Sequence, residues 1–160
     1  MNFSEQSRVW IYQADREVSD VESGLIKKLL DNFTVSWTAH NNLLKAMAEI
    51  RYNRFIVLIV DESQAGASGC SIDKSVNFIK QLESAFNLNL LNRLNMAYRD
   101  GNEVLSASRD QFEALIKTGK INTETVVFNN LVQSLSELQS KWEVPFKESW
   151  HMQLFGNLVK

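Results

Sequence analysis

Apolar and polar positions along the chain follow two periods, which predict a succession of strands and helices. Residues 8–14 are rich in β-branched and aromatic side chains, as expected of a first strand. Ser19 and Glu22 then form a capping box, which predicts the start of a helix. Apolar residues at every fourth position, widened by Ile26 and Leu30, predict one face of this helix committed to a core: Val21, Leu25, Leu29, Phe33 and Trp37. The helix is expected to stop near residues 40–42.

A β-hairpin and a second helix are expected next. Residues 44–52 alternate loosely, whereas residues 55–60 are apolar at every position. The second hairpin strand should therefore lie in the middle of a sheet that is covered on both faces. After a loop over residues 62–69, apolar residues at intervals of three and four predict the second helix: Ile72, Val76, Ile79, Leu82 and Phe86. Residues 94–99 predict another strand.

The predicted order is strand, helix, strand, strand, helix, strand, which is the split βαβ order of ferredoxin-like folds. We therefore expect an α+β protein with a ferredoxin-like βαββαβ core over residues 1–99. Its sheet should be antiparallel, with the helices on one face. Residues 100–160 predict a small αβ extension packed on the core as a single unit.

Within this extension, two further capping boxes predict helices. One is formed by Ser108 and Gln111 and opens a helix that ends at Gly119, a residue typical of helix C-termini. The other is formed by Ser134 and Glu137. Short strands are expected over residues 104–107 and 125–128.

Composition and charge exclude several classes of function. The 160 residues carry 17 basic and 19 acidic side chains, a formal net charge of -2, so no general electrostatic field would attract nucleic acid or an anionic membrane. The longest apolar run, residues 55–60, is far shorter than the roughly 20 residues needed to cross a bilayer, so no membrane insertion is expected. A single cysteine forbids an internal disulfide, and two histidines make a zinc site improbable. We expect a cytoplasmic protein without a cofactor.

Six segments together resemble an uncharacterised family of bacterial proteins, whose members are often labelled "ABC transporter ATPase". The resemblance covers nearly the whole chain and implies no established activity, cofactor or catalytic residue. The segments are VWIYQADRE, SWTAH, EIRYNRFIVLIVDE, AGASGCSIDKSVNFIKQLE, VFNNLVQS and KWEVPFKESWH.

The family label conflicts with the motifs of the chain. An ABC ATPase requires a Walker A loop, G-x-x-x-x-G-K-[ST], whose backbone N–H groups and lysine bind the phosphates. In the nearest segment only two residues separate Gly66 from Gly69, and no lysine follows directly. The signature LSGGQ is also missing, so ATPase activity is not supported. A second similarity, of residues 101–127 to GYF-type adaptor domains, lacks the aromatic residues of the peptide groove.

The loop before the second helix carries the most suggestive chemistry. It consists mostly of small residues and leads into a helix N-terminus, where backbone N–H groups and the helix dipole favour an anion. Cys70 lies at that terminus and is a candidate nucleophile or redox thiol, with His40 or His151 as a base. The candidate ligand-binding residues of the loop are Asp61, Glu62, Gly66, Ser68, Gly69, Ser71 and Asp73.

A structural interpretation accounts for the same residues. Cysteine is often buried, and a strand-to-helix turn with an N-cap also requires glycine, serine and aspartate. The three acidic residues of the loop would repel a phosphate and disfavour a thiolate. They could hold a hard cation, but ordinary solvated acids explain them as well, and no metal site is predicted. His40 could simply stabilise the C-terminus of the preceding helix.

Two aromatic groupings bear on binding partners. The C-terminal segment either packs back onto its own domain or forms a partner surface, with candidate residues Trp142, Phe146, Trp150 and His151. Arg51, Tyr52 and Arg54 form the one basic and aromatic grouping, and two arginines do not make a nucleic-acid footprint.

These observations favour a non-catalytic binding or assembly module, with an unidentified protein partner or a homo-oligomer as its target. Two alternatives stay open. One is a small cysteine-dependent enzyme or redox protein that uses Cys70. The other is a nucleotide-binding protein, for which the family label is the sole argument.

Overall fold

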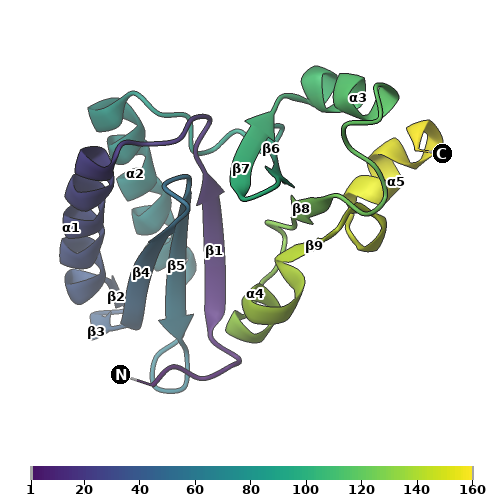
Figure 1. Cartoon of the computed structure of the whole chain (residues 1–160). Coiled ribbons are helices and arrows are strands. Elements are labelled where there is room, and N and C mark those ends of the chain that lie inside the picture. Colours follow the sequence, from purple (N-terminus) through teal and green to yellow (C-terminus); the bar gives the residue numbers. More distant parts are fainter. Residues whose placement is uncertain (1, 160) are drawn as a thin grey trace. The chain divides into compact units, whose positions relative to one another are not determined.

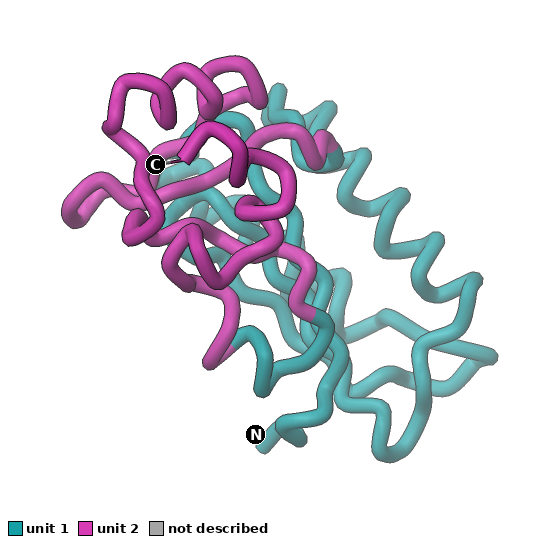
Figure 2. Tube along the Cα trace, turned by 90° about the vertical axis from the view of Figure 1, so that its right-hand side faces the viewer, with its two compact units in different colours: residues 1–91, 133–138 teal, residues 92–132, 139–160 magenta. Residues whose placement is uncertain are grey.

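The chain folds into helices and antiparallel sheets, and the computed structural model describes residues 2–159 (Figure 1). The predicted α+β class is confirmed. Two compact units are distinguished in Figure 2: residues 1–91 with 133–138 form unit 1, and residues 92–132 with 139–160 form unit 2. Within the described residues, no helix has the length and apolar character needed to span a membrane.

Unit 1 contains a three-stranded antiparallel sheet in the order β1-β5-β4, and β2 and β3 form a separate small hairpin. Helices α1 and α2 lie on one face of the sheet (Figure 1). The central strand β5 is buried at every position, as its uninterrupted apolar sequence predicts. The elements are β1 (Arg8–Gln13), α1 (Asp20–Ser36), β2 (Thr38–Ala39), β3 (Asn42–Leu43), β4 (Lys45–Arg51), β5 (Phe55–Asp61) and α2 (Gly69–Phe86).

The fourth strand of the expected ferredoxin-like core lies elsewhere. It corresponds to β6 (Met96–Asp100), which pairs with β7 and β8 in the sheet of unit 2. The edge of β1 is instead paired with residues 133–135: the Val9 N–H donates to the Gln133 carbonyl at 3.1 Å, and the Leu135 N–H donates to the Ser7 carbonyl at 2.8 Å. The ferredoxin-like order is therefore not confirmed.

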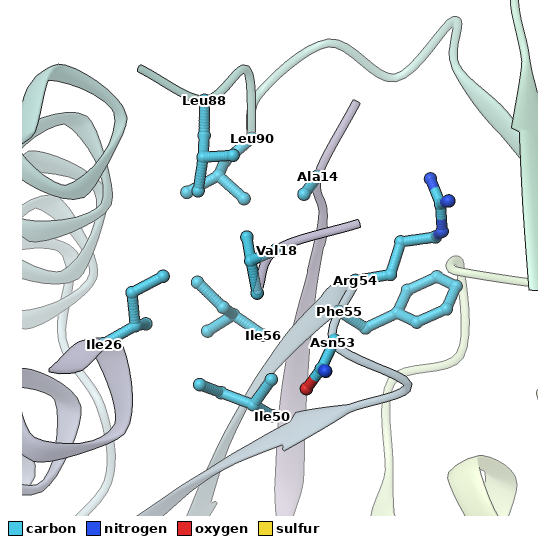
Figure 3. A pocket seen from close by; sticks show the side chains of 10 residues that line it. All are labelled: Ala14, Val18, Ile26, Ile50, Asn53, Arg54, Phe55, Ile56, Leu88 and Leu90. Carbon is cyan, nitrogen blue, oxygen red and sulfur yellow. The ribbon is translucent and has the colours of Figure 1, made fainter. Parts of the chain in front are cut away.

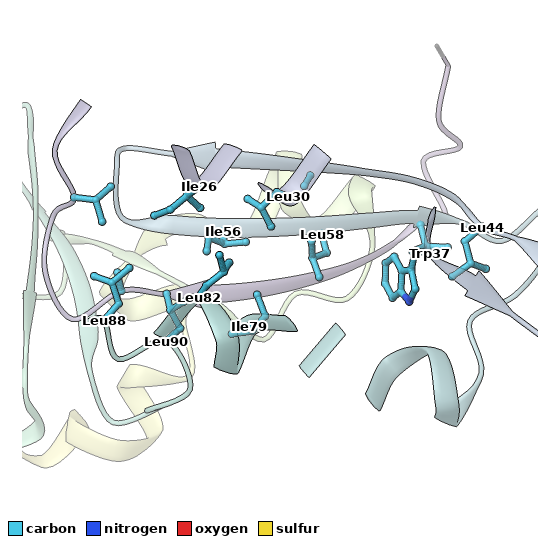
Figure 4. Close-up of a cluster of buried hydrophobic side chains, with 14 of the residues drawn as sticks. Ile26, Leu30, Trp37, Leu44, Ile56, Leu58, Ile79, Leu82, Leu88 and Leu90 are labelled. Atoms are coloured by element: carbon cyan, nitrogen blue, oxygen red, sulfur yellow. The ribbon is translucent and has the colours of Figure 1, made fainter. Parts of the chain in front are cut away.

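The core of unit 1 lies between the sheet and its two helices. Figure 4 shows Ile26 and Leu30 of α1 on the same side of the sheet as Ile56 and Leu58 of β5. Trp37, just past the end of α1, is also buried there. Ser19 caps α1 as predicted: its side chain accepts from the Glu22 N–H, and the Glu22 carboxylate accepts from the Ser19 N–H.

The buried face of α1 differs from the one predicted. Val21, Leu25 and Leu29 are exposed to 75, 52 and 40%, whereas Ile26 and Leu30 are buried. Each residue of an α-helix turns by about 100°, so a spacing of four overshoots a full turn by about 40°. Over the four steps from Val21 to Trp37 this drift reaches roughly 160°, and the two ends of the predicted face point in nearly opposite directions.

Unit 2 is built on a four-stranded antiparallel sheet in the order β7-β6-β8-β9. The predicted cap of α3 is present, with Ser108 and Gln111 bonded reciprocally, and Gly119 beyond it has a positive φ of 81°. Helix α4 crosses from unit 1 into unit 2. The remaining elements are β7 (Glu103–Ala107), α3 (Arg109–Lys117), β8 (Val126–Phe128), α4 (Leu135–Lys141), β9 (Glu143–Pro145), η1 (Phe146–Glu148), α5 (His151–Phe155) and η2 (Gly156–Leu158).

Candidate functional site

Asp61, the last residue of β5, binds backbone groups on both sides of it in the sequence. Asp61 is buried, and its carboxylate accepts from the N–H groups of Ser4 and Ser63, both at 3.0 Å. The ammonium of Lys45 lies 3.5 Å away. These donors lower the pKa of Asp61 well below its usual range, and the Ser4 N–H has the largest effect. The carboxylate is thus bound to the protein's own backbone rather than presented to a ligand.

Glu62 closes the loop that follows. Its carboxylate accepts from the Ala67 N–H at 2.8 Å and lies 3.7 Å from the guanidinium of Arg8. A Cβ at Gly66 would lie 3.1 Å from this carboxylate, so a larger residue there would require the Glu62 side chain to shift. A backbone N–H that a phosphate would need therefore already binds a carboxylate.

The N-terminus of α2 is capped by its own serines. The Ser68 hydroxyl accepts from the Ser71 N–H at 3.2 Å, and the Ser71 hydroxyl accepts from the Ser68 N–H at 2.7 Å. Ser71 is buried, and its N–H, one of those at a helix start that have no partner within the helix, is satisfied by the Ser68 hydroxyl. Gly69 has open space beside it, and Asp73 is exposed just after the first turn of α2.

Cys70 and His40 come from two segments that the fold joins. The Trp37 Nε1–H donates to the Ser71 carbonyl at 2.8 Å, and the Lys74 ammonium donates to the Thr38 hydroxyl at 3.3 Å. Cys70 is a free, exposed thiol on the first turn of α2. His40 is exposed on the turn between β2 and β3, with a φ of 51°. No hydrogen bond joins these two side chains in the described chain.

The aromatic C-terminal segment is buried in unit 2 rather than displayed. Trp142, Phe146 and His151 are fully buried, and Trp150 is half-buried. The Trp142 Nε1–H donates to the Asn130 amide oxygen at 2.9 Å. The predicted partner surface at these residues is thus replaced by the alternative interpretation, in which the segment packs onto its own domain.

His151 is enclosed by aromatic rings. It stacks on Trp150 at a ring distance of 3.9 Å and lies 5.6 Å from Phe112. Its Nδ1 shares a 2.8 Å hydrogen bond with the Ser149 hydroxyl, and its Nε2 has no partner among the described residues. Burial lowers the pKa of His151 to about 4, so the ring is neutral at pH 7. A buried ring of this kind is not accessible to act as a base for an exposed thiol.

A small hollow opens in unit 1 beside the end of α1 (Figure 3). Its lining is apolar apart from Asn53 and Arg54. The Asn53 amide donates to the Asp20 carboxylate at 2.8 Å. No nucleophile or catalytic acid lines the hollow, whose walls are Ala14, Val18, Ile26, Ile50, Asn53, Arg54, Phe55, Ile56, Leu88 and Leu90.

The basic and aromatic grouping near the β4–β5 turn does not form an open cationic surface. Arg54 is buried, and desolvation lowers its pKa from the ordinary value. The Arg51 guanidinium lies 2.8 Å from the Glu49 carboxylate. Tyr52 is exposed and packs edge-on against Phe55 at 6.3 Å.

The surface that sequence reasoning missed is the exposed side of α1. We call Val21, Leu25 and Leu29 the outer stripe of α1. They follow one another at spacings of four, so they form a single ridge on the helix surface. A helical-wheel projection with about 100° per residue would have separated this ridge from Ile26 and Leu30. Large exposed apolar side chains gathered in one place mark interaction surfaces more often than scattered ones do.

Residues 2–159 contain no cluster of three or more histidine, cysteine, aspartate or glutamate side chains arranged to hold a metal ion. Comparison with known proteins gives no match to a family model, to a curated protein or to a solved structure. The resemblance to the family labelled as ABC transporter ATPases therefore stays a prediction, and the function must be argued from the geometry of the chain.

Proposed function

We propose that this chain is a non-catalytic binding or assembly module of the cytoplasm, which docks another protein surface on the outer stripe of α1. The observation that carries the proposal is the exposure of Val21, Leu25 and Leu29 along one ridge of a long helix. Burying such a ridge against a partner removes apolar surface from water, which is the main favourable term in protein association.

The fate of the candidate catalytic groups supports the same proposal. Asp61, Glu62, Ser68 and Ser71 each bind backbone groups of the loop in which they lie. His151 is buried and neutral. Side chains that are already satisfied in this way stabilise a loop or a helix end, and they do not need a substrate to explain their positions.

One observation favours a second candidate function, a cysteine-dependent enzyme or redox protein. Cys70 is exposed at the N-terminus of α2, and the Trp37–Ser71 hydrogen bond ties this terminus to the segment that carries His40. Helix N-termini stabilise thiolates. In this alternative, replacement of Cys70 by serine would abolish function in the cell while leaving the fold intact.

The test uses a photo-crosslinking residue, p-benzoylphenylalanine, in place of Val21 in the full-length chain inside cells. The matched control carries it in place of Leu94, which is also exposed. We expect one discrete protein adduct at Val21, its loss when Leu25→Asp is added, and its persistence with Cys70→Ser. Equal adducts at both positions, or none at Val21, would overturn the proposal.

A further inference from the structure

We propose that the partner of the outer stripe is a second copy of this chain, with two α1 helices packed antiparallel across a twofold axis and crossing at Gly24 and Leu25. This inference rests on the proposed function, because it names the protein that the outer stripe binds. Three features of α1 carry it: the shape of its exposed ridge, a glycine that nothing inside the chain explains, and the distribution of its charges.

The exposed side of α1 has the shape required for packing against another helix. Val21, Leu25 and Leu29 form a ridge at spacings of four, and Gly24 and Lys28 form the next ridge beside it. Ridges at this spacing pack into the matching grooves of another helix in the most common class of helix pairs. Figure 1 shows α1 on the outside of the sheet, and its opposite side is already committed to the core of unit 1.

Gly24 has no explanation within its own chain. It is the fifth residue of a 17-residue helix, an interior position at which glycine is among the poorest residues for helix formation. A Cβ at this position would meet no atom within 4 Å, so no close internal contact requires glycine. A second helix crossing here supplies the reason. The missing side chain leaves a hollow beside Leu25, into which Leu25 of the other copy fits.

The charges of α1 are complementary to themselves when the helix is reversed. Asp20 begins the helix and is exposed. Its carboxylate accepts from the neutral amide of Asn53, and although the helix N-terminus favours an acid, it makes no ion pair with any described residue. Lys28 is exposed and makes no ion pair with any described residue. An antiparallel pair crossing at Gly24 and Leu25 places Lys28 of each copy beside Asp20 of the other. A parallel pair would instead place the two Lys28 side chains together.

This self-complementarity favours a second copy over an unrelated partner. A twofold interface uses the same patch on both molecules, so the patch must carry both members of every complementary pair. The exposed side of α1 does so, since it has a ridge and a hollow, with an exposed acid at its first residue, Asp20, and an exposed base near its middle, Lys28. Glu22 is not available for the pairing, because it already binds the Arg16 guanidinium through two contacts of 3.0 and 2.8 Å.

The first experiment measures the mass of the purified full-length chain by sedimentation equilibrium up to about 100 µM, where any association with a Kd below that value is visible. We expect a reversible dimer of the 18.3 kDa chain. Leu25→Asp should weaken association by roughly tenfold or more, since it places a charge at the centre of the crossing. Gly24→Gln should also weaken it by filling the hollow, while keeping or raising thermal stability. Leu94→Asp, at an exposed site elsewhere, is the control and should have no effect.

The second experiment exchanges the charges. Asp20→Lys and Lys28→Asp should each weaken self-association, because each puts like charges together in the antiparallel pair. An equimolar mixture of the two variants should recover a heterodimer, since every close pair then has opposite signs. Circular dichroism checks that each variant is folded. The mixture contains the same two variants, so recovery of association in it would show that neither had lost association through unfolding.

A chain that stays monomeric at about 100 µM, or a dimer that Leu25→Asp does not weaken, would overturn the inference. Failure of the mixed variants to associate would overturn the antiparallel geometry. The crosslink at Val21 separates this inference from the proposed function. An adduct that contains a different protein would leave the binding module standing and remove the second copy, whereas the absence of any adduct would remove both.

Discussion

At the scale of single residues, the buried polar side chains of Asp61, Ser149 and His151 are hydrogen-bonded. Ser149 and His151 are both buried and share one hydrogen bond of 2.8 Å. Asp61 accepts from two backbone N–H groups, those of Ser63 in the loop that follows it and of Ser4 near the start of the chain. Such groups are costly to bury unless they are hydrogen-bonded, so each of them fixes a local geometry. The imidazole of His151 adds a dependence on pH, because burial opposes its charged form.

The stability of the chain should fall as pH decreases from about 6.5 to about 4. Burial holds the pKa of His151 at about 4, whereas the ring in the unfolded chain titrates near 6.5. Between pH 6.5 and 4 the His151 ring is protonated in the unfolded state but not in the folded state. This difference lowers the free energy of unfolding by up to about 3 kcal/mol. Urea unfolding at pH 7 and at pH 4.5 measures this loss.

His151→Phe is the control for the pH effect, since it keeps a ring in the aromatic cluster and removes the titration. The variant should lose less stability than the parent chain over the same pH interval. If it folds poorly, the proton resonances of the His151 ring in the parent chain answer the same question. A ring that titrates near pH 6.5 in the folded protein would show that the expected burial effect is absent.

At the scale of secondary structure elements, local signals placed the starts of helices well and their buried faces less well. The capping boxes at Ser19 and Ser108 are present as predicted. At Ser134 only half of the box forms, because the Glu137 carboxylate accepts from the Gln133 N–H instead. A cap depends on residues three apart, whereas the buried face of a helix depends on what packs against it, as α1 shows.

Ser108→Ala should lower the free energy of unfolding by about 1 kcal/mol, the usual cost of losing an N-cap. The Ser108 hydroxyl accepts from the Gln111 N–H at 3.3 Å, and alanine leaves that group of α3 without its partner. Ser108→Thr keeps a hydroxyl and should cost only a few tenths of that amount. Denaturant unfolding of the three proteins gives the comparison. Equal stability of the alanine and threonine variants would show that the cap contributes nothing.

At the scale of the whole molecule, the second compact unit is not simply the second half of the chain. Residues 133–138 belong to unit 1, in which residues 133–135 pair with the edge of β1, and the chain then continues into unit 2. Pairing of this edge satisfies backbone groups that would otherwise be exposed, which is one way in which proteins prevent edge strands from aggregating. Unit 1 is therefore completed by residues 133–138, which are separated in the sequence from its first stretch, residues 1–91, by the residues of unit 2.

Leu135→Pro tests this return of the chain. Proline removes the N–H that donates to the Ser7 carbonyl, yet Leu135 is the first residue of α4, where proline is well tolerated. We expect a loss of about 1 kcal/mol in the free energy of unfolding, the typical net value of one hydrogen bond. Amide hydrogen exchange should accelerate at Val9, on the same edge of β1. Unchanged exchange there would indicate that residues 133–135 do not protect this strand.

Some features of the candidate site could also be predicted from the sequence, and others could not. The sequence located the loop of Asp61 to Asp73 at the junction of a strand and a helix, because small residues, an N-cap and a strand end are local features. It could not indicate that Glu62 folds back onto Ala67 or that His151 is enclosed by aromatic rings. Those outcomes depend on backbone geometry and on residues distant in sequence.

The sequence by itself determined the α+β class, the capped starts of α1 and α3, and the burial of β5 along its whole length, since propensity, capping and apolar periodicity act over a few neighbouring residues. Only the tertiary structure decided the sheet in which β6 pairs, the side of α1 that stays in water, and the place of residues 133–135 beside β1. Each of these is a choice among pairings that are compatible with the same local pattern. It is settled by the apolar surface and backbone hydrogen bonds that distant segments complete together.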